Sequence, residues 1–351
     1  MVNPSTRMFA WRKHQGNETP QWDEVPVPKT PLTGFLCKML ASGVCHSDQA
    51  MLKDTNPRPW FCEKYILGHE GCGQIVEIGD EVTDKRFKVG DIVAMFSIPG
   101  CGQEDCAECS RGTPQLCLHC HHSGIGQDGF FAPFATIDQR GAVLIPKGVS
   151  PLQAAVATDA VSTAYHAIHR RAEVKSNETV LLFGLGGLGF NGLQVLKTTG
   201  ARIIVSEVRQ ERLDAALRLG IPASDIIPIG TSVQDFVKQN GLEEKIDTTI
   251  DFVGLKQTFE DGQQVVRRAG KMVCIGTLSP ENTISMKVGV RKRLTVLFSY
   301  GAQVGDLEEV LQLIAQGAIQ PDVEQGKLED FPQWLQKLCN GKVAGRVALC
   351  T

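Results

Sequence analysis

The sequence predicts an α/β protein with two domains, one rich in β-strands and one built on a doubly wound parallel sheet. Up to about residue 150, glycine and proline divide the chain into short β-like runs with little helical periodicity. From about residue 152, strand-like and helix-like segments alternate, which is typical of a parallel sheet with helices on its faces. A glycine-rich turn joins one of these strands to the following helix. A chain of 351 residues is long enough for two domains with cores of their own.

The expected elements follow from these patterns in chain order. In the first part the clearest strand-like runs are 34–40, 73–78 and 91–96. An alanine-rich segment that follows a Ser-Pro pair predicts a helix over 151–171. The alternating segments after it are 179–183, 191–199, 203–206, 210–219, 248–252, 259–266 and 271–275. Apolar residues at helical spacing predict a helix over 306–315, and a last apolar run covers 346–350.

Composition narrows the class of partner and the compartment. The net charge of −3 gives no indication of a nucleic-acid or anionic-membrane partner. No apolar stretch is long enough to span a bilayer, and residues 1–17 lack the apolar core of a secretory signal. We therefore expect a cytoplasmic protein. In that compartment its twelve cysteines favour metal sites over disulfides.

The glycine-rich turn predicts a nucleotide cofactor. It lies between a buried strand and a helix N-terminus, where backbone N–H groups and the helix dipole favour a pyrophosphate. The residues that we assign to the cofactor here are Gly184, Gly186, Gly187, Leu188 and Gly189. The alternative is an ordinary tight turn in some other α/β protein.

Glu207 favours NAD over NADP. It ends the next strand, where a carboxylate can bind the ribose hydroxyls and would repel a 2′-phosphate. Arg209 and Arg212 argue the other way, because an arginine at this place can accommodate that phosphate. We also assign Arg209 to the cofactor site.

Four cysteines within seventeen residues predict a structural zinc site. Four thiolates can complete a tetrahedral shell around zinc, and a closed shell is structural rather than catalytic. The alternative is a set of free cytosolic thiols. The next residues, 119–122, form a second metal-like cluster that we interpret mainly as flanking loop. The four cysteines are Cys101, Cys106, Cys109 and Cys117.

Two segments upstream of the cysteine lobe each combine a cysteine with a histidine. They read Gly-Val-Cys-His-Ser-Asp over 43–48 and Gly-His-Glu-Gly-Cys-Gly over 68–73. Together with the cysteine lobe and the later dinucleotide turn, in this order, they resemble the zinc-dependent medium-chain alcohol dehydrogenases over nearly the whole chain. The resemblance implies a GroES-like catalytic domain, 1–158 and 299–351, with the zinc lobe at about 98–120. It also implies a Rossmann-type coenzyme domain over 159–298.

The resemblance also implies a catalytic zinc site. It makes Cys45 and His69 two of three protein ligands, and it places Asp159 where the family normally has a cysteine. An aspartate is a competent zinc ligand, and it leaves the site as neutral as a second thiolate would. The alternative is a helix-capping Asp159 in a zinc-free reductase. Glu70 is expected behind the ligands, or to bind the metal transiently.

Further roles follow from the same resemblance. Ser47 matches a hydroxyl that takes the alcohol proton, although it could equally be a turn-forming serine. His46 and Arg346 match residues that contact the cofactor pyrophosphate. Many relatives have a proton-relay histidine where this chain has Ala50.

These observations predict a zinc-dependent, NAD-linked oxidoreductase that interconverts an alcohol and an aldehyde or ketone, with two zinc ions per chain. A polyol or hydroxyacyl-thioester substrate is the alternative within the family. A zinc-free enoyl or quinone reductase, or a non-enzymatic protein on the same fold, is less compatible with the cysteine and histidine motifs. Ser97 and residues 56–65 are expected to line the substrate cleft. We expect a small-molecule substrate and a homo-oligomer, a dimer or a tetramer.

Overall fold

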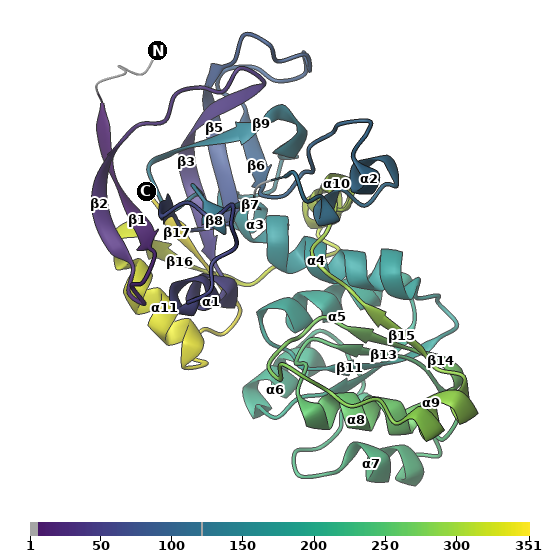
Figure 1. Cartoon of the computed structure of the whole chain (residues 1–351). Helices are drawn as coiled ribbons and strands as arrows, with labels where there is room; N and C mark the ends of the chain where they lie inside the picture. Colours follow the sequence, from purple (N-terminus) through teal and green to yellow (C-terminus); the bar gives the residue numbers. More distant parts are fainter. Residues whose placement is uncertain (1–5, 121) are drawn as a thin grey trace. The chain divides into compact units, whose positions relative to one another are not determined.

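The computed structural model of the chain describes residues 6–120 and 122–351. It divides into two compact units, which we call unit 1 and unit 2. Unit 1 comprises residues 1–162 and 302–351, and unit 2 comprises residues 163–301. Figure 1 shows the two units and the labels of their elements. No helix in the described ranges combines the length and the apolar character needed to cross a membrane.

Unit 1 is built on β-sheets. A three-stranded antiparallel sheet has the order β2-β1-β4, and a larger one has the order β10-β6-β5-β3-β17-β16, with β9 paired to β3 as its seventh strand. β16 and β17 run parallel to each other. The strands are β1 (Arg7–His14), β2 (Gln21–Pro26), β3 (Gly34–Val44), β4 (Lys64–Ile66), β5 (Glu70–Ile78), β6 (Ile92–Phe96), β9 (Phe134–Asp138), β10 (Ala142–Leu144), β16 (Val323–Lys327) and β17 (Arg346–Cys350), with the short pair β7 (His122–Ser123) and β8 (Gly126–Gln127).

Strand β3 separates two hydrophobic cores. Phe35 and Met39 belong to one cluster and Leu36 to the other, because neighbouring side chains of a strand point to opposite faces. The second cluster includes Phe131 and Phe331, whose ring centroids lie 4.5 Å apart. The helices of this unit are α1 (His46–Lys53), α2 (Ala107–Ser110), α3 (Pro151–Val156), α10 (Val304–Ala315) and α11 (Phe331–Cys339).

The alanine-rich segment forms the expected helix, but its turns are not uniform. After α3 it widens into a π-helix over Ala157–Val161, continues as α4 (Ser162–Tyr165) and widens again over His166–Ala172. Its start is well defined, since the Ser150 side chain accepts a hydrogen bond from the Gln153 N–H and Pro151 takes the first position. π-turns inside helices are frequent at functional sites, and Asp159 lies in the first of them.

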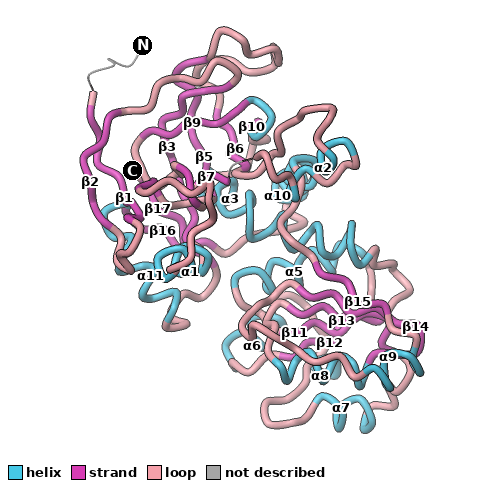
Figure 2. Tube along the Cα trace, viewed as in Figure 1, coloured by secondary structure: helices cyan, strands magenta, loops and turns pink. Residues whose placement is uncertain are grey.

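Unit 2 is a doubly wound parallel sheet of the order β12-β11-β13-β14-β15. Figure 2 shows its strands in the middle of the unit and helices along both sides. The chain runs from β11 to β12 and then crosses to β13 on the other side, so the topological switch point lies at β11. The strands are β11 (Thr179–Phe183), β12 (Arg202–Ser206), β13 (Ile246–Asp251), β14 (Val266–Cys274) and β15 (Thr295–Phe298); the helices are α5 (Gly187–Thr199), α6 (Gln210–Arg218), α7 (Val233–Gln239), α8 (Lys256–Val265) and α9 (Met286–Lys292).

The α/β class is confirmed, and the expected elements occur with shifted bounds. Helix α5 begins at Gly187, four residues before the predicted start, because Gly187 and Gly189 of the turn already belong to the helix. Strand β14 begins at Val266, where we predicted the end of a helix. The elements for which the sequence patterns gave no prediction include β1, β2, β4, β9, β10, β15, β16, α1, α2, α7, α9 and α11.

Candidate functional site

Cys45, His69 and Asp159 converge within unit 1. Cys45 is the N-cap of α1, His69 directly precedes β5, and Asp159 lies in the first π-turn. The Cys45 Sγ lies 3.7 Å from the Asp159 Oδ2, and the His69 Nε2 lies 3.7 Å from the same oxygen. Cys45 and His69 are buried, whereas 26% of the Asp159 side chain is exposed.

These distances fit a tetrahedral metal site. Zinc bonds of about 2.3 Å to sulfur and about 2.0–2.2 Å to nitrogen and oxygen separate neighbouring ligand atoms by about 3.3–3.7 Å. The potential ligand atoms of Cys45, His69, Glu70 and Asp159 all lie within 4.8 Å of one another. A thiolate, an imidazole and a carboxylate are zinc donors, and three protein ligands leave a fourth position for a substrate. The residues present therefore fit a catalytic zinc.

Asp48 holds two of these residues in place. Its Oδ2 accepts a hydrogen bond from the Cys45 N–H at 2.9 Å, and its Oδ1 lies 3.4 Å from the His69 Nδ1. Asp48 is fully buried. A carboxylate behind a histidine ligand fixes the ring and leaves the other nitrogen for the metal. We missed Asp48 in the sequence, although an acidic residue three positions after a helix N-cap is a recognisable signal.

The local charges favour the ionised form of the cysteine. Burial opposes ionisation of Cys45, but the charge of Arg346 and the hydrogen bond to His69 outweigh it, so its pKa lies below the ordinary value. A thiolate is the form that binds a metal. The lowered pKa therefore fits the prediction that Cys45 is a metal ligand.

Glu70 and Arg346 form a buried ion pair beside the cluster. Gly43 makes room for it, because a Cβ at that position would stand 2.9 Å from the Glu70 Cβ and overlap its carboxylate. The ion pair joins the Glu70 Oε1 to the Arg346 Nη2. The Glu70 Oε2 and the Arg346 Nε have no hydrogen-bond partner among the described residues. This position fits the expectation that Glu70 lies behind the ligands. The assignment of Arg346 to the cofactor stays a prediction.

The remaining predicted residues of this region lie on α1. The Ser47 Oγ is 3.6 Å from the Cys45 Sγ and is half-buried, so its hydroxyl is next to the cluster. His46 and Ala50 are exposed. Of these three residues, the structure brings only Ser47 to the predicted ligands.

Ser97 and His122 form a pair that sequence reasoning recognised only in part. The Ser97 Oγ lies 3.0 Å from the His122 Nε2, and the ring of His122 stands edge-on to that of His69 at 6.1 Å. We had assigned His122 to flanking loop, and only the folded chain shows its closeness to His69. His121, in the same cluster, lies outside the described residues.

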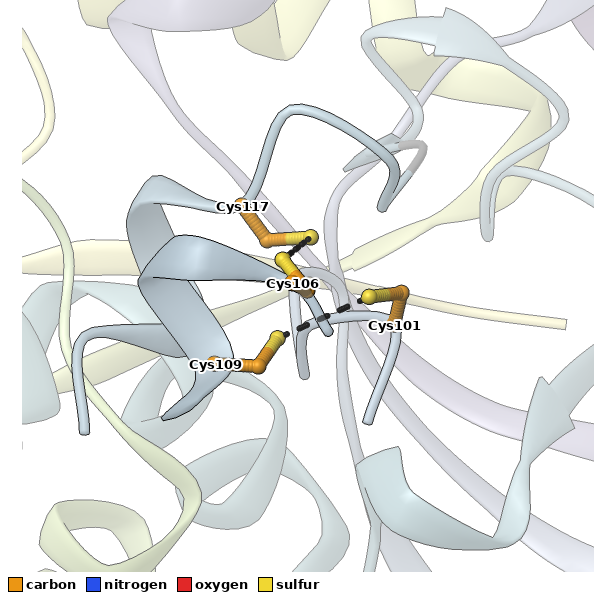
Figure 3. Close-up of side chains that lie close together, drawn as sticks. All are labelled: Cys101, Cys106, Cys109 and Cys117. Carbon is orange, nitrogen blue, oxygen red and sulfur yellow. Dashed lines mark hydrogen bonds between the residues drawn. The ribbon is translucent and has the colours of Figure 1, made fainter. Parts of the chain in front are cut away.

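The four lobe cysteines face one another, as Figure 3 shows. The sulfurs of Cys101 and Cys109 lie 3.7 Å apart, and those of Cys106 and Cys117 lie 3.6 Å apart. A disulfide would need about 2.05 Å, whereas a tetrahedral zinc with bonds of about 2.3 Å gives sulfur–sulfur edges of about 3.8 Å. Backbone N–H groups lower the pKa of Cys117 to about 7 against the effect of burial. The lobe therefore fits a structural zinc.

The glycine turn in unit 2 lies at the switch point of its sheet. Gly184 has a φ of +82°, which an L side chain rarely adopts. A Cβ on Gly189 would stand 2.9 Å from the Gly184 carbonyl carbon and closer still to its oxygen, whereas one on Gly186 would meet nothing within 4 Å. Gly189 thus allows tight packing of the helix on the strand, and Gly186 keeps the surface of the turn open. Gly187 and Leu188 form the first turn of α5.

Glu207 connects the second strand to this turn. It accepts hydrogen bonds from the Leu185 N–H at 2.7 Å and the Val208 N–H at 2.8 Å. Arg209 contacts both of its carboxylate oxygens at 3.2 Å. Burial raises the pKa of Glu207, but the hydrogen bonds and the charge of Arg209 lower it by more. The pKa of Glu207 therefore lies below its ordinary value. The carboxylate is therefore charged at neutral pH.

The comparisons with known proteins agree with this arrangement. Residues 33–147 match the model of the alcohol dehydrogenase GroES-like domain, and residues 187–316 match that of the zinc-binding dehydrogenase family. An alcohol dehydrogenase of Geobacillus stearothermophilus is 30% identical over 333 residues, covering 93% of this chain and 94% of that protein. One from Rhizobium meliloti (strain 1021) is 29% identical over 338 residues, with the same coverage.

Solved structures show the same two-part fold. Acetophenone reductase from Geotrichum candidum NBRC 4597, in complex with NAD, superposes with a TM-score of 0.88 and 28% identity, covering 100% of this chain and 98% of that one. The alcohol dehydrogenase of Aeropyrum pernix superposes with a TM-score of 0.86 and 26% identity, covering 98% and 100%. The fold is thus a GroES-like domain with a Rossmann-type domain, as predicted.

The chain belongs to the zinc-binding medium-chain alcohol dehydrogenase family. Its members named above are oxidoreductases, and this chain is an alcohol oxidoreductase of the same family.

Proposed function

We propose that this protein is a zinc-dependent, NAD-linked dehydrogenase that interconverts an alcohol and an aldehyde or ketone. The observation that carries the proposal is the convergence of Cys45, His69 and Asp159 at the separations of a three-ligand zinc site. Zinc held there supplies Lewis-acid catalysis at an alcohol or carbonyl oxygen. NAD bound at the glycine turn supplies the hydride acceptor.

The protein's own residues would hold the ligands and move the proton. The Asp48 carboxylate lies within ion-pair distance of the His69 Nδ1 and accepts a hydrogen bond from the Cys45 N–H. The partly exposed Asp159 leaves one side of the cluster accessible to a substrate. Ser47 stands beside the cluster with a hydroxyl that can accept the alcohol proton and pass it to solvent. With Ala50 where relatives have a histidine, we propose that this proton leaves through the cofactor ribose and water.

The choice of NAD rests on Glu207. Its charged carboxylate at the end of β12 would repel a 2′-phosphate, and its two contacts from Arg209 engage the guanidinium that could otherwise bind this phosphate. Acetophenone reductase, with the same fold, is in complex with NAD.

We also propose that the lobe holds a second, structural zinc, and that the protein is a cytoplasmic homo-oligomer. None of the twelve cysteines, all of which lie in the described ranges, forms a disulfide, which fits a reducing compartment. β15 is the last strand of its sheet, and the nearby Val290, Phe298 and Tyr300 are largely exposed. An edge strand with apolar neighbours favours pairing with another copy of the chain.

The test is alcohol-dependent NADH formation by the purified protein across a panel of alcohols. We expect activity with NAD that is lost on removal of zinc by a chelator and restored by adding zinc back. Activity that survives complete zinc removal would contradict the proposed mechanism. Activity only with NADP would contradict the proposed role of Glu207.

A further inference from the structure

Ser97 and His122 place hydrogen-bonding atoms next to a predicted zinc ligand. Ser97 follows the last residue of β6 and is 7% exposed, and its hydroxyl lies 3.0 Å from the His122 Nε2. The Ser123 N–H donates to the Ser97 carbonyl at 3.2 Å, which ties β7 to the end of β6. The pair is therefore held by backbone as well as side-chain contacts.

The pair lies beside the predicted ligand cluster. The rings of His122 and His69 are perpendicular, at 88°, with centroids 6.1 Å apart. The other contacts of the His69 ring are with Asp159 at its Nε2 and with Asp48 at its Nδ1. A substrate bound at this cluster, as the proposed function has it, would therefore lie near the pair.

The pair offers both donor and acceptor atoms, because the Ser97 hydroxyl and the His122 ring already lie within hydrogen-bonding distance of each other. A neutral imidazole has one donor and one acceptor nitrogen, and a serine hydroxyl can donate and accept. Together they can exchange hydrogen bonds with a hydroxyl or a carbonyl.

We propose that Ser97 and His122 are specificity-determining residues that bind a second hydrogen-bonding group of the substrate, so that the enzyme favours diols and hydroxy-carbonyl compounds over unsubstituted alcohols. This inference rests on the proposed function. An apolar substrate chain packed on the pair would exclude water from its polar atoms without replacing the lost hydrogen bonds. A site built to bind a hydroxyl discriminates against an analogue that lacks it for this reason.

The kinetic test compares 1,2- and 1,3-propanediol with 1-propanol. We expect kcat/KM for at least one diol to exceed that for 1-propanol about tenfold, equivalent to about 1.4 kcal/mol. His122→Phe keeps a ring of similar size and should bring the ratio of kcat/KM for the diol to that for 1-propanol close to one. Ser97→Ala should reduce the preference as well, and it provides a second variant if His122→Phe folds poorly. His119→Phe is the matched control, since His119 is an exposed histidine of the same loop, and it should keep the preference.

A binding measurement separates this inference from the proposed function. Calorimetric titration of the NADH-loaded protein with each alcohol measures affinity without turnover, because NADH cannot accept a hydride. We expect tighter binding of at least one diol in the wild type and equal binding in His122→Phe. Equal binding in the wild type, or a diol preference unchanged in both His122→Phe and Ser97→Ala, overturns the inference. If no alcohol is oxidised, the proposed function fails, and the calorimetric comparison still decides the role of the pair.

Discussion

Alanine substitutions at Gly186 and Gly189 of the cofactor turn should affect different properties, cofactor binding in the first case and stability in the second. Gly189→Ala adds a methyl group that overlaps the Gly184 carbonyl, a backbone group with little freedom to move. Gly186→Ala adds the same methyl group where no protein atom lies within 4 Å, at a φ of −68° that alanine adopts freely. The first variant tests packing of the protein, and the second tests approach of a ligand.

The magnitudes follow from these contacts. Overpacking typically costs about 1–3 kcal/mol, which for a domain of this size lowers Tm by about 2–10 °C, so we expect Gly189→Ala to unfold earlier than the wild type. Gly186→Ala should leave Tm within about 1 °C, because it introduces no clash. Its methyl group would instead stand where the pyrophosphate must approach the backbone, and NADH affinity should fall about tenfold or more, at least about 1.4 kcal/mol.

The assays are thermal unfolding without cofactor and fluorescence titration with NADH. If Gly186→Ala binds NADH as tightly as the wild type, the cofactor does not contact this turn. If Gly189→Ala unfolds at the wild-type temperature, the clash with Gly184 is relieved without cost, contrary to this prediction.

Three further predictions concern other parts of the chain. Cys106→Ser should remove one zinc per chain and lower Tm by several degrees, as measured by metal analysis and thermal unfolding; an unchanged metal content would show that the lobe binds none. Ala50→His should raise the turnover rate near neutral pH if proton exit limits the reaction, and an unchanged pH–rate profile would show that it does not. Glu207 has a lowered pKa in the folded protein, so it contributes stability that is complete above its ordinary pKa of about 4.3 and is lost as the pH falls through the lowered value. The Tm difference between the wild type and Glu207→Gln should therefore shrink on acidification from pH 7 to about pH 3, and a constant difference would mean that the charge contributes nothing.

Helices, strands and turns could be predicted where a short stretch of sequence carries a clear pattern of apolar residues or glycines. Strand β11 and the glycine turn followed from an apolar run and its glycines, at the expected residues. The last apolar run, for which no type of element was predicted, forms β17. The start of α5 was missed because glycine is read as loop by propensity, whereas here three glycines form the end of the turn and the first turn of the helix. Helix α11 has strong amphipathicity but was not recognised after a charged segment.

The candidate site was predictable where residue types carry chemistry by themselves. The spacing of four cysteines pointed to the lobe, and the resemblance to a known family pointed to Cys45, His69 and Asp159. His122 could not be placed, because its proximity to His69 depends on the pairing of β7 beside the end of β6 and not on its neighbours in sequence. Nor could the sequence show that Arg346 is buried against Glu70, since the two residues are 276 positions apart.

The metal content of Asp159→Ala decides whether Cys45, His69 and Asp159 hold a zinc ion. The wild type should hold two zinc ions per chain, one at each of the two ligand clusters. The variant loses the carboxylate that lies 3.7 Å from both the Cys45 sulfur and the His69 nitrogen, so it should retain one zinc, in the lobe, and have no alcohol dehydrogenase activity. Asp159→Cys, which restores a zinc donor, should hold two. Two zinc ions per chain in Asp159→Ala, or full activity with one, would contradict the account.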